Sequence, residues 1–285
     1  MDKMNLQIKH IKSQDNKYLK TYRKLNQKKW RKKLGLFPLE GFKLVQEALQ
    51  NQIELEYVII SRELEQHDAS LSIFAEIETN QGSKVPVIFV DNTVFNKTAF
   101  TDNPQGIIAA VKFREYDLDD ILNLGKDILL TADIQDPGNA GTLMRSAVAF
   151  ELGGVIFTGE SVDPTNEKVI RSSMGAIFRL MWCKNETLYV RNLLNRIFKA
   201  GYMIIAAMPD EGINSFELNS HINASPLCIV VGNETVGIPK EIFDCDIEIL
   251  QVNIPISSKS DSLNAAVAGS IIMYQAYRTR LYKDV

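Results

Sequence analysis

The chain has 285 residues, of which 45% are hydrophobic and 24% are charged, and its formal net charge at pH 7 is −3. This composition excludes collagenous, low-complexity and largely disordered chains, and the length suits one large domain or two modest ones. No apolar run reaches the ~18 residues of a membrane span, and the first ten residues lack the apolar stretch of a secretory signal. We therefore expect a cytoplasmic protein.

The N-terminal part, residues 1–112, is predicted to form a small α/β domain. Gly35 and Pro38 end its first helix, and β-branched runs mark its strands. The predicted elements are, in chain order, helices over 12–33 and 40–50 and strands over 57–60, 85–90 and 106–111. A charged, weakly patterned stretch, 113–124, is expected to be a linker or a helix that joins the two domains.

The pattern becomes more regular over residues 125–285, which are predicted to form a second domain. The predicted strands are 128–133, 154–158, 179–183, 202–208, 227–231 and 247–254. The predicted helices are 140–150, 164–176, 187–200, 239–243 and 262–281. This alternation implies an α/β fold with a parallel sheet covered by helices on both faces. Ligands of such sheets bind beyond the carboxyl ends of the strands, so the loops that follow strands are the candidate sites.

The first 33 residues form a basic arm on an acidic body. They hold ten Lys and two Arg against two Asp, a net charge of +10, whereas the remainder carries −13. Such segregation indicates a polyanionic partner, and Tyr18, Tyr22 and Trp30 offer stacking faces beside the charges. The candidate RNA contacts are Lys20, Arg23, Lys24, Lys28, Lys29 and Arg31. The alternative is a solvated helix face whose aromatic residues anchor the core.

Neither a disulfide framework nor a metal site is expected. The three cysteines include no CxxC pair, and the three histidines form no HxxxH or HExxH pattern. A Ser–His–Asp triad is not expected either, because the three histidines lie far apart in the sequence. The cysteines are predicted to be buried or idle thiols: Cys183, Cys228 and Cys245.

The loop after the first strand of the second domain reads DIQDPGNAGTLMRSA. Pro137 and Gly138 turn the chain, and Asn139 can cap the next helix with its side-chain oxygen. Arg145 follows on that helix, where it can hold a phosphate or a reacting hydroxyl group. The alternative is an arginine on a solvated helix face.

A second loop, IVVGNETVGIP, leaves the fifth strand of this domain. Gly232 and Gly237 have the spacing of a nucleoside-triphosphate loop, but Ile238 and Pro239 stand where that loop requires Lys and Ser or Thr. A kinase or GTPase is therefore excluded, and the absence of GxGxxG leaves a dinucleotide dehydrogenase without its fingerprint. The loop offers a tight turn with exposed backbone groups and the carboxylate of Glu234.

A third loop, within VNIPISSKSDSLNAAVAGSI, joins the last strand to the last helix. Ser262 and Asn264 stand at the start of that helix. Small residues follow and permit close approach to another element or to a second subunit: Ala265, Ala266, Ala268 and Gly269.

The three loops together resemble the signature motifs of a known family. Their residues are Asn139-x-Gly141-x-x-x-Arg145, then Gly232-Asn233-Glu234-x-x-Gly237, then Ile254-Pro255 with Ser262-Leu263-Asn264. In order and spacing they resemble the motifs of the SpoU (TrmH-type) branch of the SPOUT RNA methyltransferases. The basic N-terminal part, with Glu40-Gly41 before a helix and Gly106 in a strand, is similar to the L30e-like RNA-binding domain of many rRNA-modifying members.

The resemblance implies an S-adenosylmethionine-dependent RNA 2′-O-methyltransferase. It implies a SPOUT-type parallel sheet with a deep trefoil knot, a homodimer formed through the C-terminal domain, and an active site at the dimer interface. The catalytic residues would be Asn139, Arg145, Glu234 and Asn264. The cofactor-binding residues would be Gly232, Asn233, Gly237, Ile254, Ile256, Ser262 and Leu263. Ser258 stands where many members have Gly, so the local turn is expected to differ there.

Two questions stay open at this point. The family account makes Arg145 the base that accepts the ribose proton, whereas a guanidinium that stays protonated would hold the target phosphate and stabilise a developing alkoxide. Glu234 is expected to orient it. The alternative functions are a catalytically idle RNA-binding or ribosome-assembly factor, and a SPOUT enzyme that methylates a base nitrogen or acts on tRNA. The L30e-like domain favours ribosomal RNA.

Overall fold

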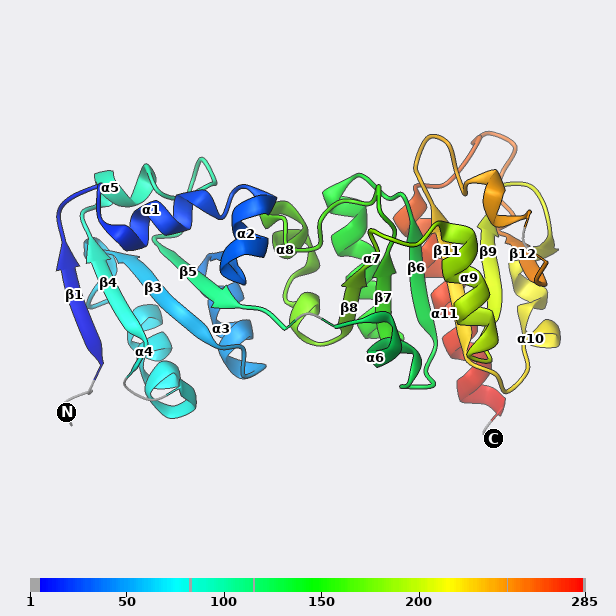
Figure 1. The fold of residues 1–285 in the computed structure, drawn as a ribbon, viewed down its shortest axis with the longest axis horizontal. Coiled ribbons are helices and arrows are strands. Elements are labelled where there is room, and N and C mark those ends of the chain that lie inside the picture. Colours follow the sequence, from blue (N-terminus) through cyan, green and yellow to red (C-terminus); the bar gives the residue numbers. More distant parts are fainter. Residues whose placement is uncertain (1–5, 82–83, 115, 245, 284–285) are drawn as a thin grey trace. The chain divides into compact units, whose positions relative to one another are not determined.

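The computed structural model describes residues 6–81, 84–114, 116–244 and 246–283, and none of the helices in these ranges has the length and apolarity to cross a membrane. The chain folds into two compact units (Figure 1). Unit 1 is Met1–Arg114 with Thr165–Phe178, and unit 2 is Glu115–Pro164 with Arg179–Val285. Each unit has its own sheet and its own hydrophobic core.

Unit 1 is built on a five-stranded mixed sheet. Its strands are, in spatial order, β1 (Gln7–Ile11), β4 (Pro86–Val90), β3 (Leu55–Ser61), β5 (Ile107–Lys112) and β2 (Leu36–Glu40). β4 pairs parallel with β1 and β3, whereas β5 pairs antiparallel with β3 and β2. The helices are α1 (Lys17–Lys24), α2 (Lys28–Leu34), α3 (Phe42–Gln50), α4 (Asp68–Gln81) and α5 (Asn92–Asn96).

Both faces of this sheet are covered. Tyr57 of β3 packs with Leu19 of α1 and Phe95 of α5 on one face. Successive strand residues point to opposite sides, so the buried Val58 and Ile60 lie on the other face, which α3 and α4 cover (Figure 1).

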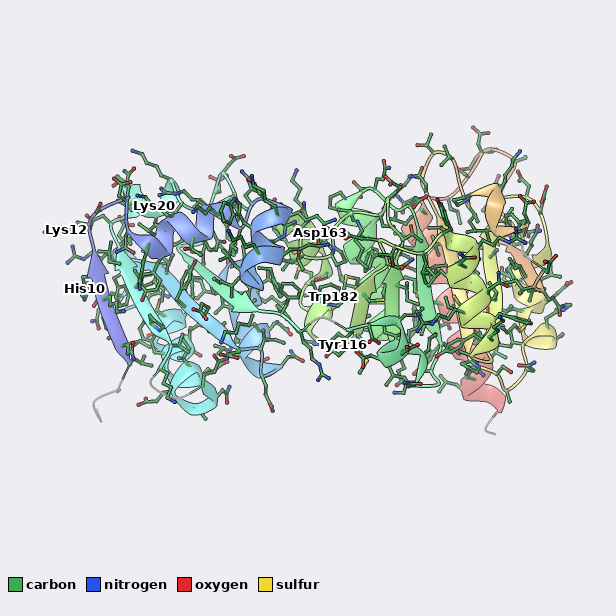
Figure 2. All side chains as sticks on the ribbon, in the orientation of Figure 1. His10, Lys12, Lys20, Tyr116, Asp163 and Trp182 are labelled. Carbon is green, nitrogen blue, oxygen red and sulfur yellow. The ribbon has the colours of Figure 1, made fainter. Side chains whose placement is uncertain are left out.

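Several elements of unit 1 differ from the sequence prediction. The predicted helix 12–33 is interrupted between α1 and α2. Residues 36–40, read as a helix stop, form the edge strand β2, where Pro38 is tolerated because an edge strand can lack one backbone donor. β1, α4 and α5 were not predicted. β1 is a short edge strand with four exposed residues, among them His10 (Figure 2), so it lacks the apolar pattern of a buried strand. α4 separates its apolar and polar residues only weakly, so its sequence gives little helical periodicity.

Unit 2 contains a seven-stranded sheet in which every neighbouring pair is parallel, and this confirms the predicted fold class. The strands are, in spatial order, β10 (Ile213–Asn214), β12 (Ile249–Asn253), β9 (Met203–Met208), β11 (Leu227–Gly232), β6 (Ile128–Ala132), β7 (Gly154–Phe157) and β8 (Met181–Lys184). The helices are α6 (Leu118–Leu122), α7 (Pro137–Ala149), α9 (Val190–Lys199), α10 (Leu218–His221) and α11 (Ala265–Lys283).

Helices cover both faces of the second sheet, with α6 and α9 on one side and α7 and α11 on the other (Figure 1). Gly269 lets α11 approach closely, because a Cβ there would lie 2.7 Å from Leu143 Cδ2 and 2.8 Å from Val231 Cγ2. The predicted linker 113–124 is partly helical: α6 buries its apolar residues in the core of unit 2.

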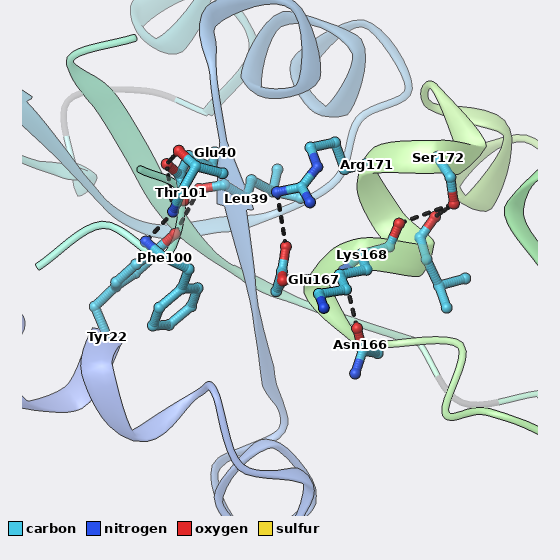
Figure 3. Close-up of polar contacts among 11 residues, drawn as sticks. Tyr22, Leu39, Glu40, Phe100, Thr101, Asn166, Glu167, Lys168, Arg171 and Ser172 are labelled. Carbon is cyan, nitrogen blue, oxygen red and sulfur yellow. Dashed lines mark hydrogen bonds and ion pairs between the residues drawn. The ribbon is translucent and has the colours of Figure 1, made fainter. Parts of the chain in front are cut away.

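The segment Thr165–Phe178 belongs to unit 1, which corrects the prediction that all of 125–285 forms one domain. It consists of α8 (Glu167–Ser173) and a 3-10 turn. Phe178 stacks on Phe37 of β2 with ring centroids 6.2 Å apart. α8 packs against β2, and Figure 3 shows its Arg171–Glu167 ion pair together with Leu39 of β2. Helical periodicity predicts that α8 buries one face, but it does not say against which sheet.

Candidate active site

The three motif loops lie at one edge of the second sheet. β6 leads through residues 133–136 into α7, β11 leads into residues 233–248, and β12 leads through residues 254–264 into α11. β6, β11, β9 and β12 are consecutive neighbours in a parallel sheet, so their carboxyl ends share an edge. Loops that are far apart in the sequence therefore meet.

A chain of hydrogen bonds joins one residue from each loop. Asn264 donates through Nδ2 to Oδ1 of Asn139 at 2.9 Å, and Asn139 donates through Nδ2 to Oε1 of Glu234 at 2.7 Å. Asn264 also caps α11, because its Oδ1 accepts from the backbone N–H groups of Ala266 at 2.9 Å and Val267 at 3.2 Å. Three of the four predicted catalytic residues are thus linked in one chain, which we call the amide relay.

The backbone fixes the direction of the amide relay. The N–H groups of Ala266 and Val267 can only donate, so the oxygen of Asn264 faces them and its nitrogen faces Asn139. The oxygen of Asn139 then faces Asn264 and its nitrogen faces Glu234. The relay ends on a carboxylate, which accepts hydrogen bonds when ionised.

The second loop is closed on itself. Asn233 and Gly237 exchange both backbone hydrogen bonds at 3.0 Å, and Oδ1 of Asn233 accepts from the N–H groups of Thr235 and Val236. Gly237 has φ +72°, a conformation that favours glycine, and a Cβ on Gly232 would overlap the backbone of Gly237. Both glycines of this motif are therefore required by the turn.

The first loop begins with a strained residue, Asp133, whose φ is +60°. Its N–H donates to Oγ1 of Thr158 at 2.9 Å, and this hydroxyl donates back to Asp133 Oδ1 at 2.5 Å. The carbonyl of Asp133 accepts from Nδ2 of Asn233 at 2.9 Å, which ties the first loop to the second. Strain of this kind costs roughly 1–3 kcal/mol and persists where its surroundings enforce it. The sequence analysis missed Thr158, although its place at the end of a predicted strand was an available signal.

One cleft of about 390 Å³ lies between the second and third loops. All seven predicted cofactor-binding residues line it, and so does Glu234. The sequence analysis did not assign the other lining residues: Ala207, Met208, Pro209, Val231, Thr235, Val236, Ile238, Ala265, Ala268 and Ile272. Ala207, Met208 and Pro209 could have been found from their place at the carboxyl end of the predicted strand 202–208.

Two expectations for the first loop need correction. Asp136, rather than Asn139, caps α7, because Asp136 Oδ1 accepts from the N–H group of Asn139 at 2.7 Å. Glu234 was expected to orient Arg145, but its Oε1 accepts from Asn139. Arg145 is exposed on α7, and its side chain makes no hydrogen bond or ion pair with any residue that the structure describes.

The basic arm lies in unit 1 and corrects two further expectations. Arg31 is wrong as an RNA contact, because its side chain is only 3% exposed and donates to Thr165 Oγ1 and to two backbone carbonyl groups. Tyr22 is buried and donates to the carbonyl of Leu39, so it offers no stacking face.

The remaining arm residues lie nearer to solvent. Lys20 pairs with Asp15 at 3.0 Å, and Arg23 donates to the carbonyl of Gln14 at 2.7 Å. Lys24 and Lys29 are exposed, and Lys28 is half-buried. RNA contact by these five residues stays a prediction.

The two described cysteines are buried thiols, and Cys245 lies outside the described residues. Burial raises the pKa of Cys183 to about 12 and raises that of Cys228 further, so neither forms a thiolate readily at neutral pH. Across the described ranges, the His, Cys, Asp and Glu side chains form no group of three that could hold a metal ion.

Comparison with known proteins places these features in a family. Residues 127–274 match the SpoU rRNA Methylase family, and residues 16–109 match the MRM3-like substrate binding domain. The chain is 26% identical over 267 residues to the 23S rRNA (guanosine(2553)-2′-O)-methyltransferase RlmP of Bacillus subtilis, a match that covers 94% of this chain and 98% of that protein. It is 28% identical over 271 residues to an uncharacterised tRNA/rRNA methyltransferase of Synechocystis, and this match covers 95% of this chain and 94% of that protein.

The fold is also similar to solved structures. The AdoMet-bound rRNA methyltransferase from Sinorhizobium meliloti matches with a TM-score of 0.79 and 27% identity, covering 95% of this chain and 98% of that one. The SpoU match alone spans more than half of the chain and includes every residue of the amide relay. The chain belongs to the SpoU rRNA methylase family.

Proposed function

We propose that the protein transfers a methyl group from S-adenosylmethionine to a ribose 2′-hydroxyl group of ribosomal RNA. The observation that carries this proposal is the amide relay, which joins the three family motifs beside one cleft. Two similar proteins support it: RlmP is named as a 23S rRNA 2′-O-methyltransferase, and the Sinorhizobium meliloti rRNA methyltransferase is described as bound to AdoMet.

The cleft fits S-adenosylmethionine in size and chemistry. Its volume lies in the range of roughly 300–1,000 Å³ that is usual for small-molecule sites. Ile254, Ile256 and Leu263 offer apolar surface, while Gly232 and Gly237 leave backbone groups uncovered by side chains. When bound, the cofactor supplies an electrophilic methyl group on a positively charged sulfur.

The protein's own residues then orient the hydroxyl group and balance charge. A bond between the ribose oxygen and the methyl carbon replaces the carbon–sulfur bond, whose electron pair stays on the sulfur of the departing thioether, and the hydroxyl proton passes to water. The oxygen must therefore be held in line while it gains negative charge. Arg145 stands on α7, the helix that also carries Asn139. Of its two possible roles we propose the clamp, because a guanidinium that stays protonated can hold a phosphate or a developing alkoxide. The amide relay holds the start of α7 against the other two loops.

We also propose the family's trefoil knot and a homodimer formed through unit 2. α11 exposes Val267, Tyr274 and Leu281, which are spaced seven residues apart and so share one face of the helix. An exposed apolar stripe of this kind suits a subunit contact. Sedimentation velocity should show a dimer for the wild type and a shift toward monomer for Tyr274→Glu. A wild-type monomer would refute the dimer.

The proposed reaction is tested with radiolabelled S-adenosylmethionine and rRNA from a strain that lacks the gene. Alkali cannot cleave the RNA chain after a 2′-O-methylated ribose, so the label should be recovered in alkali-resistant dinucleotides. Label in mononucleotides would indicate base methylation, and label in tRNA alone would overturn the choice of rRNA. Asn139→Ala serves as the control for contaminating activity, because it removes both hydrogen bonds of the relay. No incorporation into any RNA would favour the idle RNA-binding factor.

A further inference from the structure

Three lysine side chains gather around one indole ring in unit 1. The Nζ atoms of Lys24, Lys29 and Lys33 lie 4.5, 5.8 and 5.2 Å from the ring centroid of Trp30. All three lysines are exposed, and none of them forms an ion pair with a residue that the structure describes. We call these four residues the lysine–indole cluster.

The break between α1 and α2 creates this cluster. Lys29 and Lys33 are four residues apart and share one face of α2. Lys24 is the last residue of α1, and on a continuous helix it would lie about 120° around the axis and about 9 Å along it from Trp30. The predicted single helix 12–33 would therefore have separated the three charges.

The buried Arg31 fixes the break. Its Nη1 donates to the carbonyl groups of Leu25 at 2.9 Å and Asn26 at 3.1 Å, the two residues that follow α1. Its Nε donates to Thr165 Oγ1 at 2.9 Å, so the guanidinium is anchored within unit 1. The arginine that the sequence pattern assigned to RNA thus shapes the surface on which other side chains stand.

Three ammonium groups held this close repel one another. The indole face offsets part of the repulsion, since a cation–π contact at an exposed site is worth roughly 0.5–1 kcal/mol. None of the three ammonium groups lies within ion-pair distance of a carboxylate of a described residue. An RNA strand carries one phosphate per nucleotide, so adjacent phosphates can meet several ammonium groups at once.

We infer that the lysine–indole cluster, Lys24, Lys29, Lys33 and Trp30, binds the phosphate backbone of the RNA substrate. This inference rests on the proposed function for the identity of the polyanion. It narrows the sequence prediction of a basic arm with aromatic stacking faces to four residues. Arg31 leaves the site because it is buried, and Lys20 and Arg23 are already engaged with Asp15 and Gln14.

The test compares two triple variants of the full chain that lose the same charge. Lys24→Ala with Lys29→Ala and Lys33→Ala removes the cluster lysines. The matched control replaces three other exposed lysines of unit 1: Lys43, Lys84 and Lys97. RNA affinity is measured by fluorescence anisotropy with a labelled rRNA fragment between 50 and 200 mM salt, and circular dichroism checks that both variants fold.

Each phosphate contact adds about 0.7–0.9 to the slope of log affinity against log salt. The cluster variant should lower this slope by about 2 or more, so that over the fourfold salt range it loses about 16-fold less affinity than the wild type, or better. The control should change the slope by less than about 1, the contribution of a single contact. Equal slopes for the two variants would overturn the inference.

Trp30→Leu keeps every charge and removes only the ring. It should weaken RNA binding roughly five-fold at low salt, whereas Trp30→Phe, which keeps an aromatic face, should lose less. Wild-type affinity in Trp30→Leu would show that the ring does not organise the lysines. Affinity for S-adenosylhomocysteine should be unchanged in every variant, because the cleft lies in unit 2.

The outcomes separate this inference from the proposed function. If the cluster variant binds RNA normally while the wild type methylates rRNA, only the inference fails. If the wild type binds RNA through the cluster but transfers no methyl group to any RNA, the proposed function fails and the binding site stands. Competition by inorganic phosphate at millimolar concentration as strong as that by an RNA strand of equal phosphate content would reduce the cluster to a free-phosphate site and overturn backbone recognition.

Discussion

The direction of the hydrogen bonds in the amide relay can be tested by replacing its first donor, the side-chain amide of Asn264. In Asn264→Asp, the new carboxylate still accepts from the N–H groups of Ala266 and Val267, so the cap of α11 survives. It cannot donate to Asn139, however, and two oxygens would then face each other where the 2.9 Å bond now lies. Rotating the amide of Asn139 only moves the conflict to the 2.7 Å contact with Glu234.

The size of the effect follows from one lost hydrogen bond and one unpaired acceptor. Such a loss costs roughly 1–3 kcal/mol when the group is buried. Glu234 and Asn264 are exposed and Asn139 is partly exposed, so water offsets part of it and about 1–2 kcal/mol remains. Because the second and third loops line the cleft, this cost should appear as about a five- to thirty-fold weaker binding of S-adenosylhomocysteine in calorimetry.

A second substitution should restore the relay in the opposite direction. In Glu234→Gln with Asn264→Asp, the nitrogen of Asn139 donates to the carboxylate introduced at position 264, and its oxygen accepts from the amide introduced at position 234. We expect the double variant to bind the ligand within about three-fold of Glu234→Gln alone, a coupling of about 1 kcal/mol or more. Asn166→Asp is the matched control, since Asn166 caps α8 in unit 1 and the substitution adds the same charge. Additive losses in the double variant would refute the relay.

Three further substitutions probe other parts of the molecule. Arg145→Ala should lower methyl transfer about 100-fold or more while leaving S-adenosylhomocysteine affinity within a few-fold, and full activity would contradict the clamp. Thr158→Val should lower kcat/KM because it releases the strained Asp133, whereas Thr158→Ser should retain activity; equal loss in both would show that the hydroxyl group is not the cause. Arg31→Met should destabilise unit 1 by roughly 2 kcal/mol or more in thermal unfolding, because it leaves three acceptors without this donor, and an unchanged Tm would contradict the structural role of Arg31.

The sequence by itself determined the chemistry of the loops and the class of the fold. Alternating strands and helices predicted the parallel sheet, because strand and helix periods differ along the chain. The resemblance of the three loops to the family's motifs singled out Asn139, Glu234 and Asn264, and the predicted parallel sheet placed their loops at one edge, where the structure joins the three side chains. These features are local or follow from topology, so they can be read without knowing which side chains touch.

Only the tertiary structure decided which partner each side chain meets. A helical pattern shows that α8 buries a face, yet the sheet that receives it lies in unit 1. A run of positive charge does not distinguish the buried Arg31 from the exposed Lys33, because burial depends on the break between α1 and α2 and on Thr165, which lies 134 residues away. The amide relay likewise depends on contacts 95 and 125 residues apart. Such contacts form through packing, for which a single sequence carries no periodic signal.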